Sequence, residues 1–353
     1  MTRRDLLRSG TAAAILSPLA AAPGPQNLSY PLREIQGSLT PPDLFFVRDH
    51  FSEPELSLET WQLRIEGRVT HPRQLSFSDL LELSTKRIEA VLECSGNGTH
   101  GSAAGNAKWE GVPISFLFES AGLSHDAAFV ALEGADTGRL GQNSSSFPYT
   151  QIVPLEKCLD AASLIAFKMN DLFLPRRNGF PARALFPGWY AMDSVKWLRR
   201  MVVLGRGDRH ASFVDSGMDR LYNRVRLGAN GMETRRLSAI QVKSAIAWPP
   251  DKMRLAAGFY EVWGFAWTGR ESVREVAVSL NGGRGWEPAN LQSSPAPYGW
   301  VRWRYKWTAT PGEYSLMSRA TDSQGNQQPL ERDTARKDGY ELNWCAPLSC
   351  SVR

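Results

Sequence analysis

The sequence has few cysteines and none of the cysteine spacings that hold haem or zinc. Four cysteines occur among 353 residues, at positions 94, 158, 345 and 350, and no two of them form C-x-x-C or C-x-x-C-H. A covalently attached haem and a zinc knuckle are therefore excluded. Cys345 and Cys350 are close enough in the chain to pair, but Pro347 between them leaves that geometry open.

Long runs of like charge are also missing. The net charge is only +5, and no block of five or more basic residues occurs, so nucleic acid is not an expected partner. Apolar residues make up 42% and charged residues 22%, which is the balance of an ordinary globular protein. A chain of 353 residues is longer than one hydrophobic core usually supports, so two domains are expected.

No apolar run is long enough to span a bilayer, which takes about 20 residues. The N-terminus instead carries Arg3 and Arg4, then an Ala-rich apolar run over residues 11–22 that ends in small residues. This order predicts a twin-arginine signal peptide over residues 1–22, and hence a periplasmic protein exported as folded cargo. Because that route often carries proteins that already hold a cofactor, it hints at a buried prosthetic group. A disordered basic tail is the other interpretation.

Residues 23–235 mix short strands with short helical patches. The alternation over residues 61–69 predicts a strand. Ser76 followed by Asp79 predicts the start of a helix over residues 76–84, and residues 114–123 predict another helix that ends near Gly122. Long amphipathic helices are absent, so this part is predicted to be an α+β domain with a mixed sheet.

Strand patterns dominate residues 236–353. Alternating runs cover residues 258–269, 273–283, 299–309 and 312–326, and turn residues separate them. In the third run, Val301, Trp303, Tyr305 and Trp307 share one face, and Arg302, Arg304 and Lys306 share the other. Such a series predicts an immunoglobulin-like β-sandwich.

The stretch "ECSGNGTH" (93–100) holds two competing signals. Gly96, Gly98 and Gly101 spell the G-x-G-x-x-G pattern of a dinucleotide loop. That pattern requires a helix directly after the glycines, because the helix N-terminus binds the pyrophosphate. In this chain Gly105, Gly111 and Pro113 would break any helix within ten residues, so the dinucleotide interpretation fails.

Cys94 is the other signal. A free cysteine is most often a small buried hydrophobic residue. The glycines beside this one, however, let the backbone approach a large group, and a soft thiolate suits a transition metal. Basic and amide side chains in two other segments suit an anionic cofactor that carries a phosphate: Arg48, His50, Asn178, Arg183 and Lys196.

These segments carry a resemblance to a known family. "LFFVRDH", "LECSGNG", "AKWEGVPI", "FPYTQIVPL" and the long segment at 167–198 are similar to the molybdopterin domain of the sulfite oxidase family. "SAIAWP" and "SLNGGRGW" resemble its β-rich second domain. The similarity runs in order from about Pro41 to Arg353. It implies a Mo-molybdopterin cofactor (the molybdenum cofactor), with Cys94 as the thiolate that binds the metal.

The resemblance also assigns roles to single positions. Tyr149 aligns with the family's active-site tyrosine, and Arg48 with an arginine that binds the substrate anion. Cofactor contacts are implied for Phe46, Arg48, Asp49, His50, Asp136, Asn178, Arg183 and Lys196. Asp49 stands where the family usually has Asn, and Asn178 where the animal enzymes have His. One basic residue of the sandwich, Arg302 or Arg304, is a candidate for the substrate pocket.

His100 is the departure that bears on function. Sulfite-oxidising members have a second anion-binding arginine at the position that His100 occupies in this chain. Arginine is always charged, whereas histidine is charged only near or below pH about 6.5. His100 therefore predicts a weaker or pH-dependent anion pocket, or a different substrate.

The sequence leaves three functions open. The resemblance implies oxygen-atom transfer that oxidises sulfite to sulfate, with electrons passed to a separate periplasmic cytochrome, in a homodimer or a complex with that cytochrome. A second hypothesis is a molybdoenzyme that acts on another sulfur compound, as a sulfane dehydrogenase subunit does. The third, from a different class, is a cofactor-free immunoglobulin-like binding protein.

Overall fold

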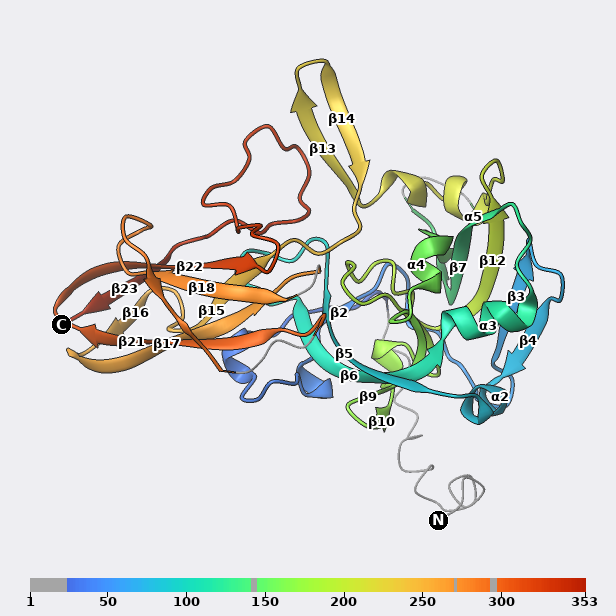
Figure 1. The fold of residues 1–353 in the computed structure, drawn as a ribbon, viewed down its shortest axis with the longest axis horizontal. Helices are drawn as coiled ribbons and strands as arrows, with labels where there is room; N and C mark the ends of the chain where they lie inside the picture. Colours follow the sequence, from blue (N-terminus) through green and yellow to red (C-terminus); the bar gives the residue numbers. More distant parts are fainter. Residues whose placement is uncertain (1–23, 141–144, 270–271, 293–296) are drawn as a thin grey trace, which may run out of the picture.

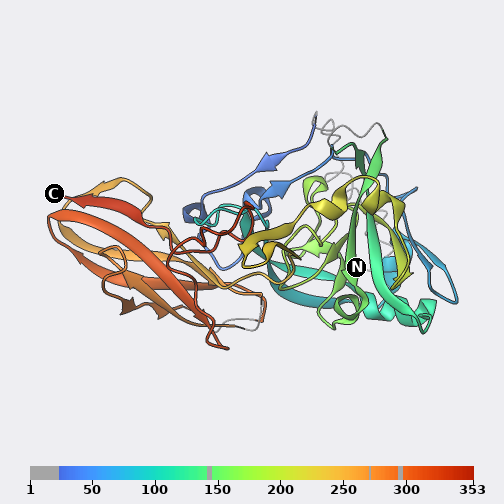
Figure 2. The same ribbon diagram turned by 90° about the horizontal axis from the view of Figure 1, so that it is seen from above.

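A computed structural model describes residues 24–140, 145–269, 272–292 and 297–353, which form two units rich in strands. The first unit lies on the right of Figure 1 and the second, which holds the C-terminus, on the left. Figure 2 shows the same pair of units from above. The predicted signal peptide (1–22) lies outside the described residues. No helix among the described residues is long and apolar enough to cross a membrane.

Two sheets build the first unit, and one of them is mixed, as predicted. The first sheet has the order β10-β9-β6-β5, with β11 also pairing β9: β5 (Lys86–Glu93), β6 (Ala104–Pro113), β9 (Leu164–Met169), β10 (Leu172–Phe173) and β11 (Arg183–Leu185). The second has the order β4-β3-β12-β7-β8: β3 (Gln62–Gly67), β4 (Arg73–Ser76), β7 (Ala127–Gly138), β8 (Phe147–Pro154) and β12 (Leu198–Gly205). In it β12 is parallel to β3 and antiparallel to β7.

The helices are short, and the two predicted ones are present. α2 (Phe77–Glu82) begins at the Ser76 cap with the Asp79 side chain returning to the Ser76 N–H, and it buries Phe77 and Leu80. α3 (Ile114–Ala121) ends at Gly122, where φ is +67°. The other helical turns within the described ranges are α4 (Leu155–Leu159), α5 (Ala211–Val214), η1 (Leu32–Glu34), η2 (Pro42–Leu44), η3 (Arg176–Asn178) and η4 (Met218–Arg220).

The second unit is the predicted β-sandwich. One sheet has the order β15-β17-β21-β20: β15 (Lys243–Trp248), β17 (Gly258–Trp267), β20 (Asn290–Leu291) and β21 (Val301–Ala309). The other has the order β16-β23-β22-β18-β19: β16 (Met253–Leu255), β18 (Val273–Ser279), β19 (Glu287–Pro288), β22 (Gly312–Asp322) and β23 (Leu348–Val352). Val301, Trp303 and Trp307 of β21 are buried in its core.

Two short strand pairings lie outside the larger sheets. β1 (Asn27–Leu28) pairs β2 (Val47–Arg48), so residues 27–28 lie against the segment that carries Arg48. β13 (Asn223–Gly228) and β14 (Gly231–Arg236) form a hairpin that stands out from the molecule in Figure 1. Leu237 N donates to Tyr222 O and closes the base of this hairpin at Tyr222.

All four cysteines are free thiols. Cys158, Cys345 and Cys350 are buried, and Cys94 is partly exposed. The pairing of Cys345 with Cys350 that the sequence left open is therefore not formed.

Candidate active site

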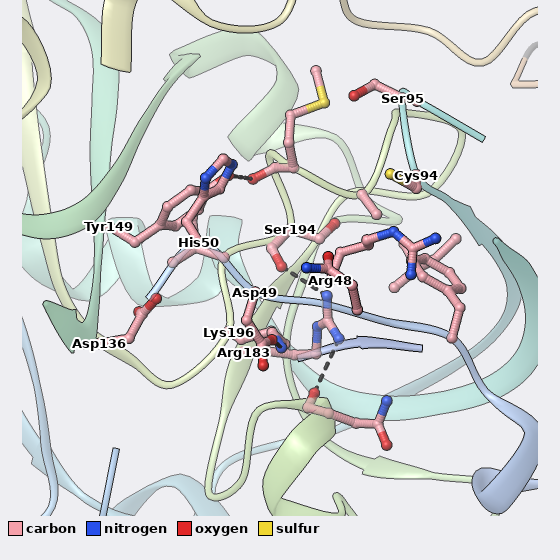
Figure 3. A pocket seen from close by; sticks show the side chains of 18 of the residues that line it. Arg48, Asp49, His50, Cys94, Ser95, Asp136, Tyr149, Arg183, Ser194 and Lys196 are labelled. Carbon is pink, nitrogen blue, oxygen red and sulfur yellow. Dashed lines mark hydrogen bonds and ion pairs between the residues drawn. The ribbon is translucent and has the colours of Figure 1, made fainter. Parts of the chain in front are cut away.

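A cavity of about 260 Å³ opens beside the end of β5. It is lined by ten of the residues predicted for the site: Phe46, Arg48, Asp49, His50, Cys94, Asp136, Tyr149, Asn178, Arg183 and Lys196. Figure 3 shows most of them converging from separate elements on one space. Segments more than a hundred residues apart in the chain thus meet at this cavity.

Cys94 directly follows β5 and starts the turn that leads to β6. Its backbone N–H donates to Ala103 O at 3.0 Å, and its carbonyl accepts from Asn97 N at 2.9 Å, so hydrogen bonds of the turn itself hold its backbone. Burial raises the pKa of the thiol, while the Gly96 N–H and the Arg48 charge oppose the rise. The thiol is therefore protonated at neutral pH, and a bound cation would be required to hold it as thiolate.

Arg48 is the cation beside that thiol. Its Nη1 donates to Leu28 O at 2.7 Å and to Val47 O at 2.8 Å, and its Nη2 donates to Ser29 Oγ at 2.6 Å. The pairing of β1 with β2 thus orients the guanidinium. No carboxylate pairs with it among the described residues, so its charge remains available to an anion.

A cluster of three rings forms another wall. The His50 ring stacks on Tyr149 with ring centroids 5.2 Å apart, and His50 Nε2 is hydrogen bonded to the Tyr222 hydroxyl. The Tyr149 hydroxyl donates to Met192 O at 3.1 Å and lies 3.4 Å from the Tyr222 hydroxyl. Burial lowers the pKa of His50 and raises that of Tyr149. At neutral pH, His50 is thus neutral and Tyr149 is a hydrogen-bond donor rather than a base.

The opposite end of the cavity is suited to a phosphate. Arg183 is 4% exposed, and its guanidinium donates to carbonyl oxygens: Nη1 to Asn178 O at 3.0 Å and Nη2 to Ser194 O at 2.7 Å. It also lies 5.5 Å from the centre of the Trp109 ring. Burial lowers its pKa to about 9, which still leaves it charged at pH 7. Lys196 pairs with Asp49. A buried guanidinium without a carboxylate is a strong anion site.

Two buried oxygens of the cavity have no hydrogen-bond partner in the part of the chain that the structure describes. They are Asp136 Oδ1 and Asn178 Oδ1, and both residues line the cavity. Burial, with a smaller contribution from Asp49, raises the pKa of Asp136 to about 7 against the opposing charge of Lys196. Because buried polar atoms are nearly always hydrogen bonded, these two oxygens are suited to the N–H groups of a bound pterin. The residues present therefore fit the implied cofactor.

His100 does not line the cavity. Its side chain is exposed, and the charges that act on its ring are those of Asp251 and Lys243, both in the second unit. The turn after Cys94 thus places residue 100 beside charges of the second unit and outside the cavity lining, and the anion-binding role of His100 stays a prediction.

The two basic candidates of the sandwich are also elsewhere. Arg302 donates to Gln36 O at 2.6 Å, and Arg304 pairs with Glu261 at 3.1 Å. Neither lines the cavity.

Sequence reasoning missed two tyrosines. Tyr222 and Tyr340 both line the cavity, and their ring centroids are 5.8 Å apart. Tyr222 precedes the β13–β14 hairpin at a φ of +56°, and Tyr340 comes from the long connection before β23. No local motif surrounds either residue, so only the folded chain reveals them.

Comparison with known proteins agrees with this geometry. Residues 50–211 match the family described as "Oxidoreductase molybdopterin binding domain", and residues 234–337 match "Mo-co oxidoreductase dimerisation domain". The fold and the cavity thus define a molybdopterin-dependent oxidoreductase, with Mo-molybdopterin as its cofactor.

Relatives narrow the class. Sulfite oxidase of Gallus gallus is 31% identical over 321 residues, which cover 82% of this chain and 68% of that protein. The mitochondrial sulfite oxidases of Drosophila melanogaster and Homo sapiens are 30% and 28% identical, and the matches cover 55% and 60% of their lengths. The chain belongs to the sulfite oxidase family.

A solved structure extends the likeness to the whole chain. The sulfane dehydrogenase SoxCD from Paracoccus pantotrophus superposes with a TM-score of 0.81 and 25% identity, covering 99% of this chain and 97% of that one. The hypothesis of a cofactor-free binding protein is wrong, because the family match includes the molybdopterin-binding domain as well as the sandwich.

Proposed function

We propose that the protein oxidises sulfite to sulfate and passes the electrons to a separate cytochrome. In this reaction sulfite and water yield sulfate, two protons and two electrons. Bound Mo-molybdopterin supplies the oxygen-atom transfer and accepts the electron pair. The observation that carries the proposal is the unpaired Arg48 guanidinium beside Cys94, because it joins an anion site to the thiolate that would hold the metal.

Each wall of the cavity has a role in this proposal. Arg48 binds and orients the anion, and its charge stabilises the negative charge that develops on the reacting group. The Tyr149 hydroxyl, which donates to Met192 O in this structure, would turn its hydrogen toward the reacting oxygen. The neutral His50 Nε2 accepts a proton through the Tyr222 hydroxyl, to which it is hydrogen bonded. Arg183 and Lys196 hold the cofactor phosphate, and Asp136 and Asn178 accept from the pterin.

A second candidate is oxidation of another sulfur compound. Two features favour it: the whole-chain similarity to the sulfane dehydrogenase SoxCD, and the set of groups around Cys94. Among the described residues, Arg48 is the arginine that acts on the Cys94 thiol, and three tyrosines line the same cavity, Tyr149, Tyr222 and Tyr340. Neutral hydroxyls bind a divalent anion more weakly than a second arginine would.

We also propose that the enzyme works in the periplasm. Export by the twin-arginine signal over residues 1–22 would deliver it to the periplasm, where cytochromes accept electrons. The dimerisation-domain match over residues 234–337 supports a homodimer or a complex with a cytochrome subunit.

The test is sulfite-dependent reduction of a cytochrome or of ferricyanide by molybdenum-loaded protein between pH 6 and 9. Turnover at micromolar sulfite is the expected result, and Cys94→Ser, which should hold no molybdenum, is the control. A fully loaded enzyme that ignores sulfite would instead favour the second candidate, and thiosulfate and protein-bound sulfane sulfur would be tried next.

A further inference from the structure

A buried lysine of the second unit is hydrogen bonded to the turn that carries Cys94. Lys243 is the first residue of β15 and is 1% exposed. Its Nζ donates to Glu93 Oε1 at 2.9 Å, to Gly98 O at 2.9 Å and to Asn97 O at 3.4 Å. All three acceptors belong to the first unit and lie within four residues of Cys94. A buried ammonium thus directs its donors to one turn of the other domain.

A tryptophan of the same domain holds the other oxygen of Glu93. Trp267 ends β17 and is fully buried, and its Nε1 donates to Glu93 Oε2 at 2.7 Å. Asn97 Nδ2 also donates to Glu93 Oε1 at 2.9 Å, and Asn97 Oδ1 accepts from Ala103 N at 2.9 Å. The two oxygens of this carboxylate are therefore fixed from both domains, one residue before Cys94.

The turn also packs tightly on the second unit. Gly101 has a φ of +78°, and a Cβ there would lie 3.1 Å from Trp267 and 3.2 Å from the Ala245 Cβ. Farther along the chain, Glu341 N donates to Ser95 O at 2.8 Å. The residues on either side of Cys94 are thus held by the second domain, through Glu93 and Ser95.

Structural stabilisation alone accounts poorly for this arrangement. A buried ion pair loses much of its attraction to desolvation, and apolar replacements are often as stable. These contacts instead fix an orientation, because the Lys243 ammonium and the Trp267 indole N–H hold the Glu93 carboxylate in one position. Because Cys94 follows Glu93 directly in the chain, fixing Glu93 also restricts the position of the Cys94 backbone.

We propose that Lys243 and Trp267 form a clamp by which the docked second domain positions Cys94. They are positioning residues, since they act through Glu93 and the turn over residues 94–101. The part of the proposal that calls Cys94 the metal ligand rests on the proposed function, whereas the fixing of the turn does not.

The first test uses the cofactor-free full-length chain and contains neither molybdenum nor substrate. Two variants loosen the clamp: the double variant Glu93→Gln/Lys243→Gln removes both charges together, and Trp267→Phe removes only the indole donor. We expect alkylation of Cys94 by iodoacetamide at one fixed pH, and amide hydrogen exchange over residues 94–101, to become about tenfold faster. Trp267→Phe keeps the packing of the aromatic ring. If the double variant does not fold, the alkylation and exchange rates of Trp267→Phe therefore test the proposal.

The control is Arg304→Gln, which breaks an exposed ion pair in the same domain and should leave both rates unchanged. Cys94 can be followed separately because Cys158, Cys345 and Cys350 are buried. Wild-type rates in both clamp variants would overturn the proposal, whatever reaction the enzyme catalyses.

A second test uses the molybdenum-loaded enzyme and separates positioning from shielding. Displacement of the Cys94 thiolate in the clamp variants should shift the visible absorption that arises from the thiolate on the metal, and it should lower kcat. KM should stay within about twofold of the wild-type value because Arg48 is untouched. Replacing Lys243 by Arg, which keeps the charge, should restore part of the wild-type spectrum. Faster alkylation with an unshifted spectrum would mean that the clamp only shields the turn, and it would also overturn the proposal.

Discussion

Arg48 and His100 are the two side chains on which anion binding was expected to depend, and the fold places them apart. Arg48 lines the cavity beside Cys94, whereas His100 faces the second domain. We therefore expect Arg48→Gln to raise KM for sulfite at least about tenfold, the loss of one charge-assisted contact. His100→Arg should change KM less than about twofold.

Steady-state kinetics at pH 8 would measure both variants, with molybdenum content as the control because Arg48 also holds the leader at Leu28 and Ser29. A His100→Arg enzyme that binds sulfite distinctly more tightly would contradict the placement of residue 100 outside the cavity. It would restore the sequence-based prediction that residue 100 completes the anion pocket.

Asp136 gives the cofactor-free protein a pH dependence of known sign. Burial raises its folded pKa to about 7, above its ordinary value. Between pH about 4 and 7 the folded state keeps a proton that the unfolded state has lost, so stability falls as pH rises through that window. Asp136→Asn removes this loss, so the variant should gain stability over wild type from pH 5 to pH 7.5, at up to about 1 kcal/mol per pH unit.

Urea unfolding of both proteins at the two pH values would measure the effect. Subtracting wild type from variant is necessary because burial also raises the pKa of Asp193, to about 6, in the same direction. An equal difference between the two proteins at pH 5 and pH 7.5 would show that Asp136 does not titrate in this range.

At the scale of single elements, α2 offers the clearest local test. Ser76 Oγ accepts from Asp79 N at 3.2 Å, and Asp79 Oδ2 accepts from Ser76 N at 2.7 Å. These two hydrogen bonds form a capping box. Ser76→Ala removes the bond that the Ser76 side chain accepts and should lower the unfolding free energy by about 1 kcal/mol. Ser84→Ala, at an exposed position just after the helix, is the control. A loss no larger than that of the control would mean that the buried Phe77 and Leu80 alone hold α2.

Elements with a complete local signal could be predicted from the sequence. The cap of α2, the glycine that ends α3 and the alternation along β21 are each encoded within a few residues, and each is present. The molybdopterin site was also within reach, because Cys94 and Arg48 lie in family-like segments.

Other parts of the site depend on contacts between distant segments and could not be predicted. Tyr222 and Tyr340 carry no motif, and Lys243 meets Glu93 across 150 residues of chain. The place of His100 outside the cavity lining was also out of reach, because the path of the turn after Cys94 decides which way its side chain points.

At the scale of the whole molecule, the cavity belongs to both domains. Tyr340 of the connection before β23 lines it, and Lys243 and Trp267 hold the Cys94 turn from the sandwich. A cofactor bound in the cavity should therefore stabilise the two domains together. Ligand at a hundred times its dissociation constant adds about 2.7 kcal/mol, and a tightly held cofactor should add more.

Calorimetry of the loaded and cofactor-free proteins would show this coupling. We expect one main transition in each, with the loaded protein melting at least about 5 °C higher, since 1 kcal/mol moves the Tm of a large domain by about 2–4 °C. The comparison variant is Glu93→Gln/Lys243→Gln. It should reduce the difference in Tm between the loaded and the cofactor-free protein, because it weakens the connection between the domains. If a separate transition of the sandwich stayed at the same temperature with and without cofactor, the two domains would be independent, and binding in the cavity would be a property of the first domain alone.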